Sequence, residues 1–460
     1  MPKRIVCAVL FPVVIRCRRK ITAETIGRPM LKRTRSGTVF QYLFGCILGV
    51  CTSEMDDRYD VIIAGAGPAG AQCARDLAER GYDVVVLETE AEDEFPAQSN
   101  KSTGGTFASM MASFSIPDDV VMHATDSVVI ESPNNYLVRD QPGFVLEFSE
   151  FKEFLVEDGR RKGADYRFDA RVRDPIVDNG DVVGVRYNSD EEIYAEIVID
   201  ATGPAAPLAK SLDVVDLERK NHAIGIEYQF EGINLDHPGY ADLADAMMLQ
   251  LNHEYAPGGY SWIFHTGGDT AKVGVCFIQN KRYREHATED RTVDGFLEYW
   301  LETDPRFENA KRVSDTQVRG SAHIQPPGAM STSSFMAIGD TVPSVDPVWG
   351  EGVYKCMKSA RAAAVTADRC LTGTVDTSTE AMAVYDDLWH EQVAPRQNRR
   401  QMMTRLLYLA SNERYDQLMK DLNELSKDSL SAINDGNIRK IAKLFYLSDL
   451  PLLWRYWREP

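Results

Sequence analysis

Three glycines, Gly65, Gly67 and Gly70, have the spacing of a phosphate-binding turn and follow a short apolar run, Val61–Ala64. In such a turn the first glycine permits the tight bend, the second lets the backbone approach a pyrophosphate, and the third lets the next helix pack closely on the strand. The start of that helix offers N–H groups and the positive end of its dipole to phosphates. The spacing therefore predicts a dinucleotide site.

The acidic residue that completes this motif is Glu88, at the end of a second apolar run, Val84–Leu87. A carboxylate there accepts hydrogen bonds from ribose hydroxyls and would repel a 2′-phosphate, which favours the adenosine of NAD or FAD over that of NADP. The strand, turn, helix, second strand and acidic residue occur in full, and this context makes the motif specific. The alternative is the same unit without a ligand.

Two later segments favour FAD over NAD. The run Phe335–Asp340 reads as a strand that ends in Gly-Asp, and the Asp340 carboxylate can bind the ribityl hydroxyls of a flavin, which NAD lacks. The segment Asp346–Val353 leads into a helix, where we expect Gly350 and Gly352 to expose N–H groups that stabilise negative charge on a reduced flavin ring. The alternatives are a helix-capping Asp and a plain helix start.

Charge is unevenly distributed along the 460 residues. Before Met55, ten Lys or Arg stand against two acidic residues, a balance of +8, which leaves −26 for the rest of a chain whose net charge is −18. So acidic a body argues against nucleic-acid binding and favours a protein that works in high salt, where charge is screened. The alternative is an ordinary acidic enzyme.

The basic residues 1–55 form an N-terminal extension that we expect to be disordered or not native, because Met55 resembles a natural start just before the first strand. Its two apolar stretches, Ile5–Ile15 and Val39–Cys51, are too short to span a bilayer comfortably, which leaves a membrane anchor as the minority interpretation. No two of the eight cysteines form a Cys-x-x-Cys pair and the eight histidines are scattered, so the sequence predicts no metal site.

The glycine turn, Gly339-Asp340 and Asp346-Pro347…Gly350-Glu351-Gly352 together resemble the geranylgeranyl reductase family, within the p-hydroxybenzoate hydroxylase-like flavoproteins. The resemblance covers about residues 56–372. It implies FAD as cofactor and the reduction of isoprenoid double bonds, including those of archaeal ether lipids and of chlorophyll side chains.

The resemblance also implies roles for single residues. Thr103, in Lys101-Ser102-Thr103-Gly104-Gly105, stands where the family often has a cysteine, and Phe148 stands where it usually has an arginine, so these two places depart from the family pattern. The cofactor-binding residues that it implies, together with the glycines above, are Ala69, Glu88, Thr103, Gly104, Val172, Asp340, Gly352 and Val353.

An aromatic hairpin is predicted in the substrate half of the chain. Tyr260, Trp262 and Phe264 alternate along a strand and therefore share one face, Gly267-Gly268-Asp269 forms the turn, and Ala271–Phe277 returns. The hairpin resembles the family's aromatic segment, which faces the flavin and the prenyl chain. The alternative is ordinary packing of the sheet against a helix.

Positioning these residues requires an α/β fold: a Rossmann-like FAD-binding domain, an inserted antiparallel-sheet substrate domain, and a helical C-terminal region. After the extension, we expect the FAD-binding domain at 56–205 and 331–375, the substrate domain at 206–330 and the helices at 376–460. The C-terminal helices either pack on the core, cover a substrate tunnel or touch a bilayer.

The function that these features predict is FAD-dependent saturation of isoprenoid double bonds in a prenyl lipid, with hydride from reduced flavin and Tyr260 as the local candidate for the proton donor. An external donor, either ferredoxin or a reduced nicotinamide, must supply the electrons. We expect a cytoplasmic protein, with peripheral membrane contact as the alternative. The rival functions are an electron-transfer dehydrogenase, a flavin monooxygenase and a prenyl-lipid carrier without turnover.

Overall fold

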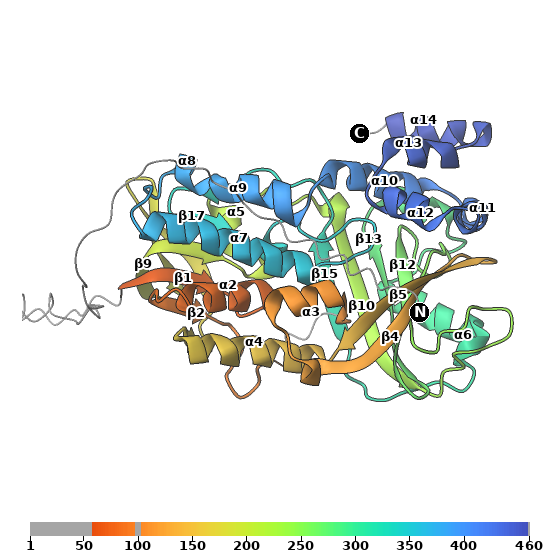
Figure 1. Ribbon diagram of the computed structural model, residues 1–460, viewed down its shortest axis with the longest axis horizontal. Helices are drawn as coiled ribbons and strands as arrows, with labels where there is room; N and C mark the ends of the chain where they lie inside the picture. The colour runs from red at the N-terminus through yellow and green to blue at the C-terminus, as the bar shows by residue number, and fades with distance from the viewer. Residues whose placement is uncertain (1–57, 97–102, 459–460) are drawn as a thin grey trace, which may run out of the picture. The chain divides into compact units, whose positions relative to one another are not determined.

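The computed structural model describes residues 58–96 and 103–458, and Asp56–Pro460 forms one compact unit. The predicted N-terminal extension and the residues Lys101 and Ser102 of the predicted loop lie outside the described residues. Within the unit, two sheets carry the cavity-forming segments, and helices from distant parts of the chain cover them (Figure 1).

The first sheet is built around β1, which pairs in parallel with β2 on one side and with β9 on the other. The strand order β16-β17-β9-β1-β2-β6 brings the end of β17 next to the first glycine turn, although the two are far apart in sequence. A hairpin of β7 and β8 extends the sheet from β9. The strands are β1 (Arg58–Ala64), β2 (Val84–Leu87), β6 (Asp165–Arg167), β7 (Val172–Asp178), β8 (Asp181–Tyr187), β9 (Glu191–Asp200), β16 (Ser331–Thr332) and β17 (Phe335–Ala337).

Small residues let the helices of this layer approach closely. Helix α2 (Pro68–Ala78) lies against both α7 (Val353–Leu371) and α4 (Phe148–Lys162), and Figure 1 shows it between them. Alanine is the most frequent buried residue type in α2, and also in α7. Pro68 at the first helical position needs no N–H partner, so the helix can begin directly after the glycine turn.

The second sheet has the order β14-β10-β13-β12-β11-β4-β5-β3, with β15 beside β10. Its strands are β3 (Gly105–Phe107), β4 (Val121–Glu131), β5 (Tyr136–Leu146), β10 (His222–Glu231), β11 (Ala246–Gln250), β12 (Gly259–Gly267), β13 (Thr270–Ile278), β14 (Lys311–Arg312) and β15 (Val318–His323). The predicted aromatic hairpin is confirmed as β12 and β13, which pair antiparallel.

Two features of this sheet differ from the expectation. Strands β3, β4 and β5 belong to it, although residues 105–146 fall in the stretch that we assigned to the FAD-binding part. The pair β4 and β11 is parallel in an otherwise antiparallel sheet. Both differences have one cause: a strand's partner across more than a hundred residues is set by long-range packing, which local alternation of side chains does not encode.

The helical C-terminal region is confirmed. It contains α8 (Thr379–Met382), α9 (Val384–Leu388), a π-helical turn (Trp389–Val393), α10 (Gln397–Leu409), α11 (Asn412–Asn423), α12 (Lys427–Asn434), α13 (Ile438–Ile441) and α14 (Leu450–Arg458). The remaining helices are α3 (Ala108–Phe114), α5 (Pro207–Ser211) and α6 (Val293–Thr303). Tyr408 and Tyr415 anchor α10 and α11 in the core, and α11 packs on β5. Among the described residues, no helix is both long and apolar enough to cross a membrane.

The acidic body predicts a strong dependence of stability on salt. Residues from Met55 onward carry −26, and the Debye length shrinks from about 30 Å at 0.01 M salt to about 3 Å at 1 M. Crowded carboxylates raise the free energy of the compact state more than that of the expanded chain. We expect the thermal midpoint to rise steeply with KCl from dilute to molar concentration. A midpoint that stays flat or falls in melting curves across that range would contradict the high-salt interpretation.

Candidate functional site

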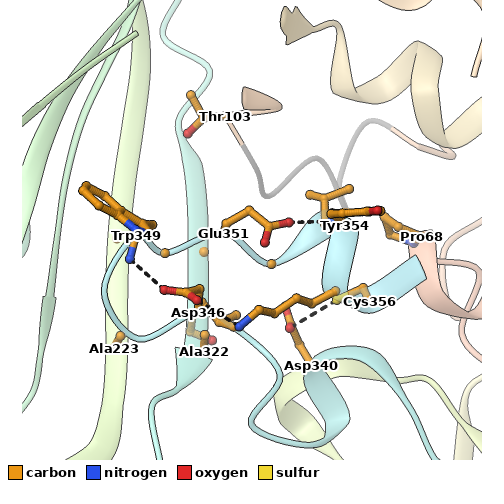
Figure 2. A pocket seen from close by; sticks show the side chains of 18 of the residues that line it. Pro68, Thr103, Ala223, Ala322, Asp340, Asp346, Trp349, Glu351, Tyr354 and Cys356 are labelled. Atoms are coloured by element: carbon orange, nitrogen blue, oxygen red, sulfur yellow. Dashed lines mark hydrogen bonds and ion pairs between the residues drawn. The ribbon is translucent and has the colours of Figure 1, made fainter. Parts of the chain in front are cut away.

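A cavity of about 1390 Å³ reaches both sheets and receives most of the residues that the sequence singled out. Its lining includes the glycine turn after β1, the segment from Thr103 to Phe107, residues 223–227 of β10, several residues of β12, and most of the segment from Val345 to Cys356. This volume exceeds that of a typical pocket for one small ligand. Figure 2 shows the part of the lining around Asp346, Glu351 and Asp340.

The glycine turn has the shape that the spacing predicts. Gly65 has φ +102°, and a Cβ on Gly70 would collide with the carbonyl oxygen of Gly65, so both positions need glycine. A Cβ on Gly67 would meet nothing within 4 Å, and Gly67 and Ala69 both line the cavity. The first turn of α2 has no acidic residue and no side-chain cap, which suits an anionic group at this helix start.

Glu88 lies beside this turn and is held by it. Its carboxylate accepts hydrogen bonds from the backbone N–H groups of Ala66, at 2.7 Å, and Glu90, at 3.0 Å. The side chain is buried and lines the cavity, as does Val172 at the start of β7. Because each carboxylate oxygen can accept a second hydrogen bond, the orientation still fits a ribose diol.

A positive charge lies one turn beyond Phe148 along α4. Phe148 is the first residue of that helix and is buried, whereas Lys152, one turn later, is 2% exposed and lines the same cavity. The Lys152 ammonium lies 4.6 Å from the centroid of the Phe95 ring. A comparison with the family at position 148 alone does not reveal Lys152. Residues at i and i+4 occupy the same face of a helix, so Lys152 lies on the same face of α4 as Phe148.

Asp340 lies in the 3₁₀ turn Gly339–Thr341 after β17, at the floor of the cavity. Burial raises the pKa of this carboxyl from 3.8 to about 6. Among the described residues, the carboxylate accepts from the Cys356 thiol, at 3.3 Å, a weak donor (Figure 2). A partly exposed carboxylate at the cavity with a weak donor as partner fits a ligand that brings its own hydroxyl donors, as the ribityl chain of FAD does.

The segment between Asp346 and Gly352 is fixed by buried ion pairs. The Asp346 carboxylate accepts from Lys355, at 3.0 Å, and from Arg400, at 2.8 Å. Burial alone would raise the pKa of Asp346, but these two cations hold it below its usual range. Asp346 also accepts from the N–H of Trp349, so the turn and the start of α7 form one rigid unit.

The expectation for Gly350 is wrong in one respect. Its N–H donates to the carbonyl oxygen of Asp346, at 2.8 Å, and so is not available to a flavin. Glycine is required there for another reason: φ is +67° and a Cβ would overlap the hydroxyl of Tyr260. Gly352 is the N-cap of α7 and lines the cavity with Val353, where first-turn N–H groups lack acceptors within the helix.

The predicted aromatic face of β12 lines the other end of the cavity. Tyr260, Trp262 and Phe264 all belong to the lining, together with Met247 and Leu249 of β11. The Tyr260 hydroxyl donates to the carbonyl oxygen of Trp349, at 3.3 Å, and burial raises its pKa well above 10.

Small residues leave room on two further strands of the same sheet. Strands β10 and β15 place Ala223 directly across from Ala322 and Gly225 across from Gly320, and all four line the cavity. Figure 2 shows Ala223 and Ala322 on the two strands. The cavity therefore borders a sheet face on which β10 and β15 carry small residues and β12 carries aromatic ones.

A buried acid, Glu227, lines this part of the cavity and was missed by sequence reasoning. It is 4% exposed, accepts from the Trp262 indole N–H at 2.8 Å, and hydrogen-bonds the Thr103 side chain. Burial raises the pKa of Glu227, against the opposing effect of the Lys272 charge.

A sequence signal for Glu227 did exist. Ala223, Gly225 and Glu227 alternate along β10 and therefore share one face of the strand. An acid on the same strand face as two small residues is unusual, because burying a carboxyl costs free energy unless hydrogen-bonding partners compensate. The sequence does not identify those partners.

Folding also gathers three potential metal ligands that the sequence shows as scattered. Ligand atoms of His123, Asp245 and His265 all lie within 4.8 Å of one another. The nitrogens of His265 are engaged, because Nδ1 accepts from the N–H of Asp245 at 2.9 Å and Nε2 contacts the Gly268 oxygen at 3.1 Å. These contacts describe a neutral histidine that fixes a turn, and the absence of a metal site stays a prediction.

Comparisons with known proteins agree with this geometry. The profile of the geranylgeranyl reductase catalytic domain matches residues 224–316, and that of an FAD-binding domain matches residues 60–135. A digeranylgeranylglycerophospholipid reductase of Haloferax volcanii is 63% identical over 400 residues, which cover 87% of this chain and 98% of the relative. The reductase of the same name from Methanoculleus marisnigri is 30% identical, over 73% of this chain and 82% of its own.

Solved structures share the fold. A geranylgeranyl bacteriochlorophyll reductase-like protein from Thermoplasma acidophilum superposes with a TM-score of 0.72 at 22% identity, over 84% of this chain and 98% of that one. A flavin-dependent brominase gives a TM-score of 0.62 at 20% identity, over 76% and 87% of the two chains. At these identities the likeness concerns the fold alone.

Proposed function

The chain belongs to the digeranylgeranylglycerophospholipid reductase family and is an FAD-dependent reductase of prenyl lipids, and from that premise we propose that its substrate is a glycerophospholipid carrying two geranylgeranyl chains. The observation that carries the proposal is one continuous cavity with two different ends. One end offers the glycine turn, Glu88 and Asp340, and the other an apolar channel of aromatic and small residues.

The cofactor end suits FAD residue by residue. The N–H groups at the start of α2, next to Gly67 and Ala69, would hold the pyrophosphate, and Lys152 would supply the positive charge that Phe148 lacks. Glu88 would hold the adenosine ribose, Val172 would contact the adenine with its backbone, and Asp340 would hold the ribityl hydroxyls. Thr103 with Gly104, and Gly352 with Val353, would border the flavin ring, while Gly350 acts only by making room for Tyr260.

The chemistry that bound, reduced FAD would supply is a hydride for one carbon of the double bond, so the protein must supply a proton to the other carbon. Glu227 suits this role better than Tyr260, because it is a carboxyl group inside the channel and burial raises its pKa, which favours the form that carries a proton. Tyr260 is far less acidic and its hydroxyl is committed to the Trp349 carbonyl. After the transfer, the Glu227 carboxylate is stabilised by the charge of Lys272 and by the Trp262 N–H.

The energetics allow the lipid to enter and leave. Burying a chain of about 20 carbons, at about 0.8 kcal/mol per CH₂, yields more than roughly 10 kcal/mol relative to water. The same chain gains a similar free energy in a bilayer, so transfer from membrane to channel is close to neutral. A substrate drawn from a membrane requires peripheral membrane contact, and an external reductant, ferredoxin or a reduced nicotinamide, must reload the flavin.

Lipid mass spectrometry tests the proposal. Purified holoenzyme, reduced with dithionite, should add two hydrogens per double bond to a digeranylgeranyl phospholipid, and a strain without the gene should accumulate the unsaturated lipid. Normal lipids in that strain would favour an electron-transfer dehydrogenase. An oxygen-dependent product would indicate a monooxygenase, and lipid binding without reduction by any donor would indicate a carrier.

Narrowing the channel should change the chain-length preference. We expect Ala322→Phe to lower kcat/KM for a geranylgeranyl chain by about tenfold or more, because the new ring fills space beside Ala223. A geranyl chain, half as long, should lose much less, and the flavin content should not change. Steady-state rates with the two substrates check this, and equal losses for both chains would contradict the channel assignment.

A further inference from the structure

The last described residues carry an unusual concentration of exposed apolar side chains. Six of the eleven large apolar side chains that are exposed in the described residues lie between 438 and 457. Leu447 is 87% exposed and Trp457 is 78% exposed. We call this set the C-terminal patch; its members are Ile438, Tyr446, Leu447, Leu450, Trp454 and Trp457.

Four of these residues form one stripe. Leu447, Leu450, Trp454 and Trp457 are spaced by three, four and three residues, which places those within α14 on one helical face. The opposite face holds the helix to the protein, because Leu452 and Tyr456 pack on the core cluster beside α10. The Arg405 guanidinium lies 4.8 Å from the centre of the Tyr456 ring. The exposed face is therefore presented by a docked helix.

The charge around the patch is opposite to that of the chain as a whole. Residues 438–458 contain five Lys or Arg and a single acid, Asp449, in a chain of net charge −18. That acid is buried and paired with Arg414, at 3.0 Å. Arg439, Lys443 and Arg458 are exposed. An apolar stripe with two tryptophans and a cationic border matches the interface of an anionic lipid bilayer.

The patch also lies next to the cavity along the chain. Asn434 and Asp435, at the end of α12, line the cavity, and the patch begins three residues later. The Asn434 side chain accepts a hydrogen bond from the Trp349 indole N–H at 2.7 Å, and its carbonyl accepts from Arg400. Figure 1 shows α13 and α14 beyond α10. The cavity-lining residues at the end of α12 and the apolar stripe on α14 are therefore joined by a short run of consecutive helices.

We propose that the C-terminal patch docks the protein on a bilayer with anionic headgroups, so that a prenyl lipid passes from the membrane into the cavity beside α12. The purpose of this docking rests on the proposed function, whereas the binding to a bilayer can be measured independently of the reductase activity. Two copies of the chain are a poorer occupant, because their apposed patches would bring like charges together.

Flotation of the full-length protein with vesicles tests the docking. Wild-type protein should float with vesicles that contain phosphatidylglycerol, and Leu450→Asp with Trp457→Asp should lower the partition coefficient about tenfold or more. Lys443→Glu with Arg458→Glu should lower it by about fivefold per charge at low salt, and have little effect at about 1 M KCl, where charges are screened. The matched control, Val177→Asp with Val313→Asp, changes two exposed valines elsewhere and should float like wild type.

The outcomes separate docking from catalysis. All variants should reduce detergent-dispersed prenyl lipid at the wild-type rate, and the Leu450/Trp457 variant should fail only with lipid in vesicles. Equal flotation of the patch variants and wild type would overturn the proposal, as would a loss of dimerisation in the Leu450/Trp457 variant without a change in flotation. Protein that floats through the patch but reduces no lipid would instead refute the proposed function.

Discussion

Asp340→Ala should release most of the flavin while leaving the fold intact. The wild-type carboxylate lines the cavity and accepts from the Cys356 thiol. The hydrogen bonds that we propose with the ribityl hydroxyls would be charge-assisted, and the loss of one such bond costs about 1.5–3 kcal/mol. We expect FAD affinity to fall by roughly 10- to 150-fold, measured by flavin absorbance after gel filtration and by titration of the apoprotein.

The controls separate cofactor binding from structure. Cys356→Ala removes the partner of Asp340 but keeps the carboxylate, so this variant should retain FAD. Asp340→Asn keeps the shape of the side chain without its charge, and should lose affinity almost as Asp340→Ala does. Wild-type flavin content in Asp340→Ala would contradict the assignment of this end of the cavity to the ribityl chain.

The pKa of Asp340 adds a pH dependence to the same variants. The carboxyl titrates at about 6 in the folded apoprotein and at 3.8 in the unfolded chain. Ionisation therefore destabilises the apoprotein above pH 6, by about 3 kcal/mol at most, and this penalty disappears as the pH falls toward 3.8. Asp340→Asn should melt at a higher temperature than wild type at pH 8, with a difference that vanishes near pH 4. A constant difference would contradict the shifted pKa.

Glu227→Gln should abolish most of the reductase activity while the FAD content stays normal. General acid catalysis contributes about 100- to 10,000-fold, and we expect a loss of the rate of flavin reoxidation by prenyl lipid within that range. Glutamine can still accept from the Trp262 N–H, so the aromatic wall should keep its place. Stopped-flow oxidation of prereduced enzyme by the lipid measures the step directly.

The pH profile distinguishes a proton donor from a residue that only orients Trp262. In wild type the oxidation rate should fall as the pH rises through the pKa of Glu227, because the acid form is the reactive one, and the slow rate of the variant should lack this dependence. Trp262→Phe removes the indole partner but keeps the acid, and should lose much less activity. Equal losses in the two variants, with the same pH profile, would reduce Glu227 to a positioning residue.

The cofactor half of the site could be predicted from sequence because its determinants are local. The turn from Gly65 to Gly70 and the acid Glu88 lie in one strand–helix–strand unit, where each residue type follows from a backbone conformation or a nearby phosphate. Asp340 and the start of α7 are distant in sequence from the glycine turn, yet each was predicted from the residues immediately around it. The aromatic hairpin was predictable for the same reason, since its turn and its alternation of side chains are both local.

Only the tertiary structure shows the contacts between residues that are far apart in the sequence. Lys152 lines the cavity together with Phe148 because α4 turns that face toward it, and Glu227 meets Thr103 and Trp262 only when β10 and β12 share a sheet. The Gly350 N–H was lost to Asp346 because two buried cations fix that turn. A local sequence pattern indicates which interactions a residue can make. Long-range packing decides which groups it contacts, and packing therefore determined that Glu227, Lys152 and the exposed face of α14 are available for function.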